Sequence, residues 1–190
     1  LPLNIVHRDV SPKNIMLAYD GTVKIVDFGI GRVRDGVAMT ETGTLKGTPY
    51  YMSPEQARGQ PLDHRSDIFS MGAVLYELLR GKRLFRAEGT MAVLDEMREC
   101  AHIPERLGEL EVPNSLRDIV ARAVEPELSK RYQQARELHQ DLQRYLFIHH
   151  ADYTYRDVSV LLQREFAALK RASEALAVKL PRVAGMKEAR

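Results

Sequence analysis

The stretch His7-Arg8-Asp9-Val10-Ser11-Pro12-Lys13-Asn14, followed further on by Asp27-Phe28-Gly29, decides how this chain is interpreted. It places three polar side chains, those of Asp9, Asn14 and Asp27, on short segments that flank apolar runs. Two carboxylates and an amide are ligands that suit a Mg²⁺ ion which also binds phosphate. The first question is therefore whether the fold brings the three together.

A β-hairpin between these segments would do so. The runs Asn14–Tyr19 and Thr22–Val26 have the composition of strands, and the Asp20-Gly21 pair that joins them is a strong signal for a hairpin turn. The two open ends of an antiparallel hairpin lie together. We therefore expect Asn14 and Asp27 to be neighbours, with Asp9 close by.

Composition sets the broad class of protein. The chain has 190 residues, 44% hydrophobic and 28% charged, which is typical of a globular domain. A net charge of +2 gives no general electrostatic reason to bind nucleic acid. The single cysteine, Cys100, excludes an intramolecular disulfide and fits a reducing compartment, so we expect a cytoplasmic protein.

No apolar run approaches the roughly 18 residues of a membrane span. Because the first residue is Leu1 and not Met, we expect the chain to come from a longer protein.

Three motifs resemble those of the protein-kinase family, in its bacterial-type Ser/Thr branch. His7-Arg8-Asp9 with Asn14 is similar to the catalytic loop, and Asp27-Phe28-Gly29 is similar to the metal-binding loop. The block Gly47–Glu55 resembles the substrate-binding loop that ends in Ala-Pro-Glu, with Ser53 in place of alanine. The order and spacing of the three motifs make the match specific.

The resemblance implies the roles of the polar residues. Asp9 would be the catalytic base for a substrate hydroxyl, with loop capping as the alternative. Asn14 and Asp27 would hold Mg²⁺, for which Mn²⁺ is the alternative. Met16 would lie beneath the adenine ring of ATP, or would belong simply to the core.

One position departs from the family pattern. Ser/Thr kinases usually carry a lysine two residues after the catalytic aspartate, and this chain has Ser11 there. Lys13 could take over the contact with the γ-phosphate, or it could be a solvated loop lysine. Thr48 matches the family threonine that bonds to the catalytic aspartate and helps to select a hydroxyl substrate.

Residues 30–46 are polar and without sustained periodicity, which predicts a loop. Their position between Asp27 and Glu55 resembles that of the family's activation loop. Arg8 is the residue that receives an activation-loop phosphate in relatives, and an arginine fork suits phosphate. Thr40 and Thr42 are candidate phosphorylation sites. The alternative is that both threonines are ordinary polar loop residues.

Other matched residues have structural roles in the family. His7 would support Phe28 of the metal-binding loop. Glu55 would pair with Arg131 and fix the substrate-binding loop to the helical base of the domain. Asp67 resembles the aspartate that holds the backbone of the catalytic loop, although capping of a helix N-terminus is its alternative.

The remaining chain is predicted to be helical. Apolar residues recur at helical spacing over residues 63–81, with Gly81 at the position of a C-terminal cap. We expect further helices over residues 90–101, from Ser115 with a capping-box-like start to before Pro126, and over residues 133–146. The fold class is therefore mainly α with a small β-hairpin. Residues 1–147 would form a kinase-like C-lobe with the N-lobe absent from this chain, because no Gly-x-Gly-x-x-Gly occurs in it, and residues 148–190 a helical extension.

These observations favour an enzyme. The resemblance implies a protein Ser/Thr kinase that transfers the γ-phosphate of ATP to a protein substrate and needs an N-lobe or upstream segment as its partner. A truncated, non-catalytic lobe that binds proteins is the alternative. A small-molecule phosphotransferase shares the Asp-Asn-Asp arrangement but does not explain residues 47–55. No nucleic acid and no membrane span are expected as partners.

Overall fold

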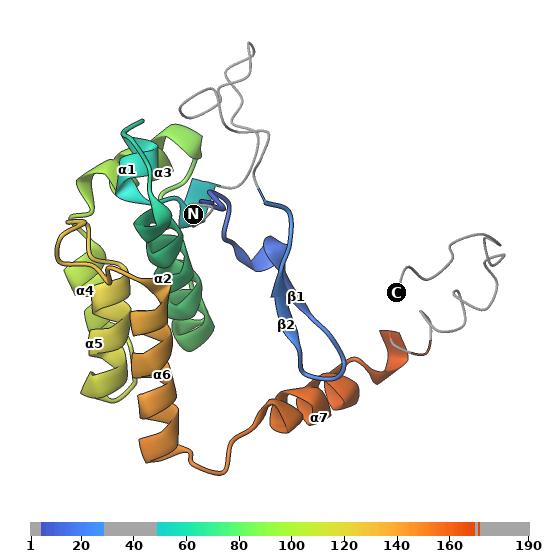
Figure 1. Ribbon diagram of the computed structural model, residues 1–190. Helices are drawn as coiled ribbons and strands as arrows, with labels where there is room; N and C mark the ends of the chain where they lie inside the picture. The colour runs from blue at the N-terminus through green and yellow to red at the C-terminus, as the bar shows by residue number, and fades with distance from the viewer. Residues whose placement is uncertain (1–4, 29–48, 170, 172–190) are drawn as a thin grey trace, which may run out of the picture. The chain divides into compact units, whose positions relative to one another are not determined.

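The fold is mainly helical with one two-stranded antiparallel hairpin, as Figure 1 shows for the computed structural model, and this confirms the predicted fold class. The structure describes residues 5–28, 49–169 and 171. Within these, the elements are η1 (Pro12–Asn14), β1 (Ile15–Leu17), β2 (Val23–Ile25), η3 (Pro49–Tyr51), α1 (Pro54–Ala57), α2 (His64–Arg80), α3 (Thr90–Glu99), α4 (Ile103–Gly108), α5 (Asn114–Ala123), α6 (Ala135–His149) and α7 (Tyr155–Glu165).

The hairpin has the predicted turn but shorter strands. Gly21 adopts φ +88° and donates its N–H to the carbonyl of Ala18 at 2.9 Å, while the Asp20 carboxylate accepts the N–H of Thr22 at 2.8 Å. Only glycine adopts this φ without strain, which explains the Asp-Gly pair. Strand β1 begins after Asn14 because that residue completes the 3₁₀ turn started by Pro12.

Helix α2 is the centre of the helical part. Its predicted bounds are confirmed to within one residue at each end. The carboxylate of Asp63 caps the N-terminus by accepting the N–H of Arg65 at 2.8 Å. Gly81 ends the helix in the left-handed conformation, with φ 72°. The predicted C-terminal cap is therefore confirmed, and Asp63 is the cap at the N-terminus.

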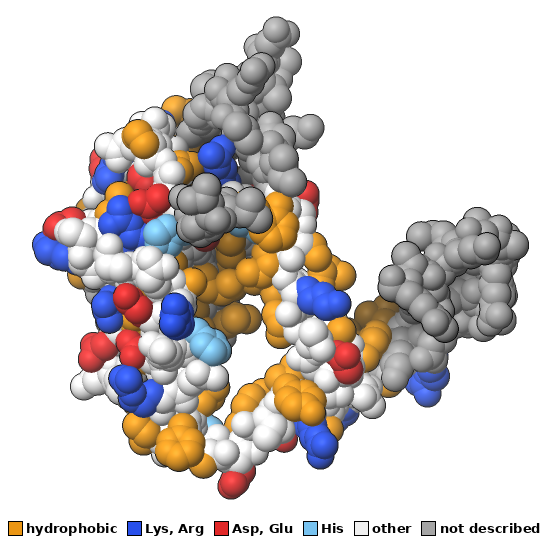
Figure 2. All heavy atoms as spheres, viewed as in Figure 1, with side chains coloured by type: hydrophobic (Ala, Val, Ile, Leu, Met, Phe, Trp, Pro, Cys, Tyr) orange, Lys and Arg blue, Asp and Glu red, His pale blue; other side chains and the backbone are white. Residues whose placement is uncertain are grey.

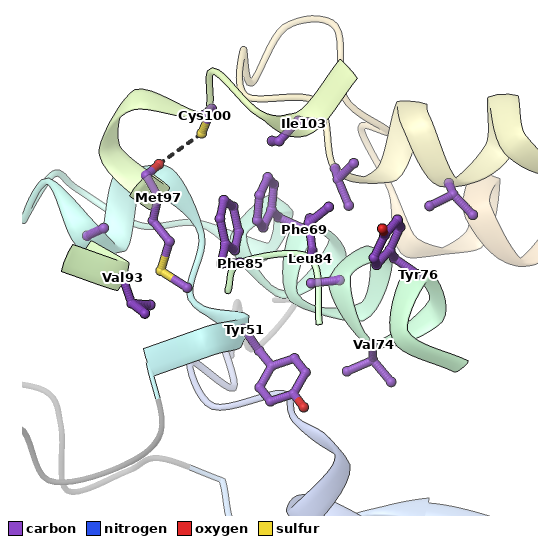
Figure 3. Packing of buried hydrophobic residues seen from close by; sticks show 14 of the residues in the cluster. Tyr51, Phe69, Val74, Tyr76, Leu84, Phe85, Val93, Met97, Cys100 and Ile103 are labelled. Carbon is purple, nitrogen blue, oxygen red and sulfur yellow. Dashed lines mark hydrogen bonds between the residues drawn. The ribbon is translucent and has the colours of Figure 1, made fainter. Parts of the chain in front are cut away.

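The main hydrophobic core is built around α2 (Figure 3). Phe69 of this helix stacks on Phe85, with ring centroids 6.2 Å apart, and Val93 and Met97 of α3 are buried in the same cluster. Gly72 of α2 lies against α5, where a Cβ atom would come within 2.8 Å of the Ala123 side chain. Close helix packing of this kind gives the functional loops a rigid base.

Cys100 belongs to this core. Its thiol donates to the carbonyl of Met97 at 2.8 Å (Figure 3), and burial raises its pKa to about 11. A buried thiol that stays protonated is a poor nucleophile. Cys100 is therefore a packing residue in this structure.

Two short helices were missed by the sequence analysis, and the capping box expected at the start of another is absent. Helix α4 has Pro104 in its first turn, where proline is well tolerated. Helix α1 begins at Pro54 in the same way. Helix α5 begins at Asn114 after Pro113, and no side chain caps it, so the capping box expected at Ser115 is absent.

The chain divides into two compact units. The first comprises Leu1–Met16 and Ile25–Asp152, and the second comprises Leu17–Lys24 and Tyr153–Arg190. In the second unit, helix α7 packs against the hairpin turn: Ser159 Oγ and Gln163 Nε2 both donate to the carbonyl of Tyr19, at 2.7 and 3.3 Å. Part of the predicted helical extension thus contacts the turn.

Replacement of Gly21 by alanine is expected to release α7 from this turn. A Cβ atom on Gly21 would come closer than 3.0 Å to the Tyr155 carbonyl and within 3.3 Å of the Ser159 nitrogen, both of which are backbone atoms. Hydrogen exchange of the α7 amides should therefore be faster in Gly21→Ala. Gly89→Ala is the matched control, because Gly89 has a similar φ of +91° but nothing within 4 Å. Equal α7 protection in the two variants would contradict the expectation.

The described helices include none that combines the length and apolar character of a membrane span.

Candidate active site

The backbone of the catalytic-loop segment is held by Asp67 of α2. The Asp67 carboxylate accepts the N–H of His7 at 2.7 Å and the N–H of Arg8 at 2.9 Å. Burial raises the pKa of Asp67, and the two N–H groups only partly offset that rise. The N-terminal cap of α2 is Asp63, so Asp67 does not fill its alternative role. The loop before Asp9 is thus tied to the central helix.

Asp9 lies beside two of the predicted site residues. Asn14 Nδ2 donates to the Asp9 carbonyl at 2.8 Å and to Asp9 Oδ2 at 3.0 Å. Lys13 Nζ lies 3.4 Å from the same Oδ2 atom. Ser11, which occupies the position usual for lysine, is buried, with its hydroxyl 3.5 Å from the Asp9 carbonyl. Lys13, and not Ser11, therefore brings positive charge to the carboxylate.

Asp27 stands at the open end of the hairpin with Asn14. The N–H of Val26 donates to the carbonyl of Asn14 at 2.9 Å, and Asp27 follows directly with a left-handed φ of 60°. Asn14 is 5% exposed, whereas Asp27 is exposed. An amide oxygen and a carboxylate at one hairpin end fit Mg²⁺, which is usually bound by one or two carboxylates together with phosphate oxygens.

The donor set is small. Within the described ranges, no three His, Cys, Asp or Glu side chains are placed so as to hold a metal ion. A Mg²⁺ ion here would therefore depend on an amide and on the phosphates of a nucleotide as well as on carboxylate oxygens.

His7 connects the catalytic-loop segment to the segment before Gly29. Its ring lies 4.7 Å from the Phe28 ring between centroids, and its Nε2 atom is 3.1 Å from the carbonyl of Val26. The His7 side chain is buried. His7 therefore packs against the segment of Val26 and Phe28, and its burial leaves little of the ring accessible for chemistry.

Glu55 and Arg131 form a buried ion pair. The Nη1 and Nη2 atoms of Arg131 lie 2.8 and 3.2 Å from the two carboxylate oxygens of Glu55, with side chains 0% and 3% exposed respectively. Ser66 Oγ also donates to Glu55, at 2.7 Å. Burial raises the pKa of Glu55, but the hydrogen bonds and charge of Arg131 outweigh it and leave the pKa below its usual value. Helix α1 is thereby fixed to the segment after α5.

For the other predicted site residues, the structure gives the exposure or the backbone conformation, or does not describe the residue. Met16 is 54% exposed, which does not fit its alternative role as a core residue. Arg8 is half-buried, with a left-handed φ of 66°. Thr40, Thr42 and Thr48 lie outside the described residues.

One residue at the site was missed. Gln56 Nε2 donates to the carbonyl of Arg8 at 2.9 Å, although the two are 48 residues apart. One of the two side-chain interactions of Gln56 could have been predicted, because Ser53-Pro54-Glu55-Gln56 matches a capping box, which the structure forms. The second bond of Gln56 depends on tertiary structure and has no sequence signature.

Comparison with known proteins agrees with this geometry. Residues 2–158 match the protein kinase domain, so the chain belongs to the protein kinase family. It is 40% identical over 148 residues to "Tyrosine-protein kinase MasK" of Myxococcus xanthus, covering 78% of this chain and 23% of that protein. It is also 40% identical over 140 residues to "Serine/threonine-protein kinase PknB" of Mycolicibacterium smegmatis, covering 73% and 22%.

A third relative, "Probable serine/threonine-protein kinase CPE1738" of Clostridium perfringens, is 38% identical over 141 residues, which cover 74% of this chain and 20% of that protein. The chain thus spans between a fifth and a quarter of the length of these relatives.

Proposed function

We propose that this chain supplies the catalytic loop of a protein Ser/Thr kinase, which transfers the γ-phosphoryl group of ATP to Ser or Thr hydroxyls of proteins. The observation that carries the proposal is the arrangement of Asp9, which has Asn14 at 3.0 Å and Lys13 at 3.4 Å from one carboxylate oxygen. The loop that contains Asp9 is held to α2 because the N–H groups of His7 and Arg8 donate to the Asp67 carboxylate. The names of two relatives support the Ser/Thr assignment.

Each of these residues has a separate proposed role in phosphoryl transfer. Asp9 orients the substrate hydroxyl and accepts its proton as the oxygen attacks the γ-phosphorus and the bond to the β-phosphate oxygen breaks. Asn14 fixes the Asp9 carboxylate through its amide hydrogen bond. The positive charge of Lys13 is near enough to stabilise charge that develops on the γ-phosphate. Met16 offers an exposed apolar side chain to the adenine ring.

The proposed metal site is formed by Asn14 and Asp27. A bound Mg²⁺ ion supplies positive charge that neutralises the phosphates during transfer. The two residues come from opposite sides of the hairpin end, which is held by the bond between Val26 and Asn14. The hairpin therefore sets the spacing of the two metal ligands.

We propose the mode of regulation and the substrate choice from the family motifs. Phosphate on Thr40 or Thr42 would pair with Arg8 and order the activation loop. Thr48 would contribute to the selection of hydroxyl substrates. The proposed organisation is a C-lobe over residues 1–147 with a helical extension from residue 148. We also propose a cytoplasmic location, which the single cysteine supports.

The hairpin presents apolar surface that suits a further partner. Met16 is 54% exposed on one face of the hairpin, whereas Leu17 and Val23 are 51% and 56% exposed on the other face, because consecutive strand residues point to opposite faces. Figure 2 shows hydrophobic side chains at the surface in the region of the hairpin. Exposed apolar patches mark interaction sites. We propose that a kinase N-lobe or upstream segment covers the Met16 face of the hairpin and completes the ATP site.

The identity of the phosphate acceptor tests this function. The chain fused to a complete kinase N-lobe, called the N-lobe fusion below, would be given three peptides that differ only in a central Ser, Thr or Tyr. We expect Ser and Thr to be phosphorylated at least about tenfold faster than Tyr, a difference of roughly 1.4 kcal/mol in the barrier. A preference for Tyr would overturn the assignment and would agree with the name of the Myxococcus relative.

A further inference from the structure

Gln56 uses both ends of its side-chain amide. Its Oε1 atom accepts the N–H of Ser53 at 3.0 Å, while its Nε2 atom donates to the carbonyl of Arg8 at 2.9 Å. Its own N–H donates to Ser53 Oγ at 3.3 Å, which completes a capping box at the start of α1. One planar group thus connects the segment before α1 to the catalytic-loop segment.

The residue that Gln56 holds has an unusual backbone. Arg8 has φ 66°, a conformation that residues with a side chain adopt rarely and keep only where the surroundings hold them. Asp67 accepts the Arg8 N–H at 2.9 Å. Gln56 accordingly holds the other side of the same residue, through its carbonyl.

That carbonyl belongs to the peptide group between Arg8 and Asp9. Its orientation fixes the direction in which the Asp9 backbone leaves Arg8, and so the position of the Asp9 side chain. The N–H of the same peptide group donates to His7 Nδ1 at 3.3 Å, so Gln56 and His7 hold its two ends. Loss of the Gln56 bond would remove one of these two restraints on rotation of the peptide, while Asp67 still held the N–H groups of His7 and Arg8. The Gln56 bond therefore restrains a degree of freedom that Asp67 leaves open.

We propose that Gln56 is a positioning residue that couples the substrate-binding segment to the catalytic loop. The inference deepens the proposed kinase function and rests on it. Ser53 belongs to the end of the substrate-binding motif, Gln56 directly follows that motif, and Arg8 directly precedes the proposed base. Because the two bonds share one rigid amide, a displacement of the Ser53 segment moves the donor away from the Arg8 carbonyl. A correctly seated substrate-binding segment therefore aligns Asp9.

Gln56→Glu tests this coupling without removing the helix cap. A glutamate completes a capping box as well as a glutamine does, so the bond with the Ser53 N–H is retained and α1 stays capped. At neutral pH, however, the introduced carboxylate has no proton to donate and faces the Arg8 carbonyl with a second acceptor. Gln60→Glu is the matched control, because it makes the same change of charge at an exposed position four residues further along.

The first measurement is hydrogen exchange of the 190-residue chain, followed in peptides that cover residues 7–10. We expect Gln56→Glu to accelerate exchange in these peptides about five- to tenfold through the Asp9 amide, whose peptide group loses the Gln56 bond, and Gln60→Glu to leave the exchange unchanged. Equal protection in the two variants would overturn the proposal. This measurement needs no kinase activity, so it tests the connection even if the N-lobe fusion transfers no phosphate.

The second measurement is steady-state kinetics of the N-lobe fusion. We expect Gln56→Glu to lower kcat about tenfold with an unchanged KM for ATP, because the base is displaced while the ligands Asn14 and Asp27 are left in place. An unchanged kcat, or a loss confined to KM, would contradict the positioning role. If the parent fusion is itself inactive, the kinase proposal fails, and the exchange result still decides the connection.

Discussion

Arg131→Met is expected to lower the free energy of unfolding by about 3–5 kcal/mol, the usual cost of removing one member of a buried ion pair. The guanidinium group is fully buried and donates to both Glu55 oxygens and to the carbonyls of Arg65 and Glu125. Methionine fills much of the space but leaves the Glu55 carboxylate buried with Ser66 Oγ as its remaining side-chain donor. The loss would be measured by urea unfolding at pH 7.

The control for this prediction is Lys130→Met at the next position. Lys130 pairs with Glu127 at the surface, with side chains 66% and 54% exposed, and exposed pairs contribute little. We expect its midpoint of unfolding to stay close to that of the parent chain. A similar loss of stability in both variants would mean that the buried pair is not what fixes α1.

The pH dependence of Arg131→Met provides a second check. In the parent chain the pKa of Glu55 is lowered from 4.5, so the pair contributes stability above pH 4.5 that is lost as the pH falls through the lower folded-state pKa. Without Arg131, burial raises the pKa of Glu55 instead. Folding of the variant should then be accompanied by proton uptake at Glu55. The difference in free energy of unfolding between the parent chain and the variant should therefore shrink as the pH falls from 7 towards 4. A deficit independent of pH would contradict this electrostatic account.

Asp9→Asn is expected to lower kcat of the N-lobe fusion by about 10²–10⁴-fold, the usual contribution of a well-placed general base. Asparagine keeps the shape of the side chain but cannot accept the proton of the substrate hydroxyl. The KM for ATP should change little, because the proposed metal ligands Asn14 and Asp27 are unaltered. The measurement is steady-state phosphorylation of a Ser peptide at saturating Mg-ATP.

Asp118→Asn is the matched control for Asp9→Asn, since Asp118 is an exposed carboxylate on α5. Its kcat should equal that of the parent fusion. If Asp9→Asn also kept the parent kcat, Asp9 would be a loop-capping residue and the base would have to be sought elsewhere.

Elements whose ends or turns are marked by local sequence signals were predicted correctly. The Asp-Gly turn predicted the hairpin, and helical periodicity with Asp63 and Gly81 at the ends predicted α2. Helices α1 and α4 were missed because they are only four and six residues long. Such helices have too few turns to show a period, and they form because tertiary packing holds them.

The distinction between local sequence signals and tertiary contacts also applies to the candidate site. Asp9, Asn14 and Asp27 could be expected to lie together because one turn and one hairpin connect them in sequence. The approach of Glu55 to Arg131 and of Asp67 to the His7 N–H was anticipated through the family motifs, not from residue chemistry. Gln56 could not be assigned to Arg8, because no local pattern indicates which distant carbonyl an amide will reach.

Transfer of labelled γ-phosphate from Mg-ATP to a protein substrate tests the kinase proposal most directly. The samples are the chain alone, the N-lobe fusion, and the fusion with Asp27→Ala. We predict strong labelling by the fusion, weak or no labelling by the chain alone, and loss of labelling in Asp27→Ala because a proposed Mg²⁺ ligand is removed. Labelling that Asp27→Ala leaves unchanged would contradict the mechanism, and a folded but inactive fusion would favour a protein-binding lobe in place of a kinase.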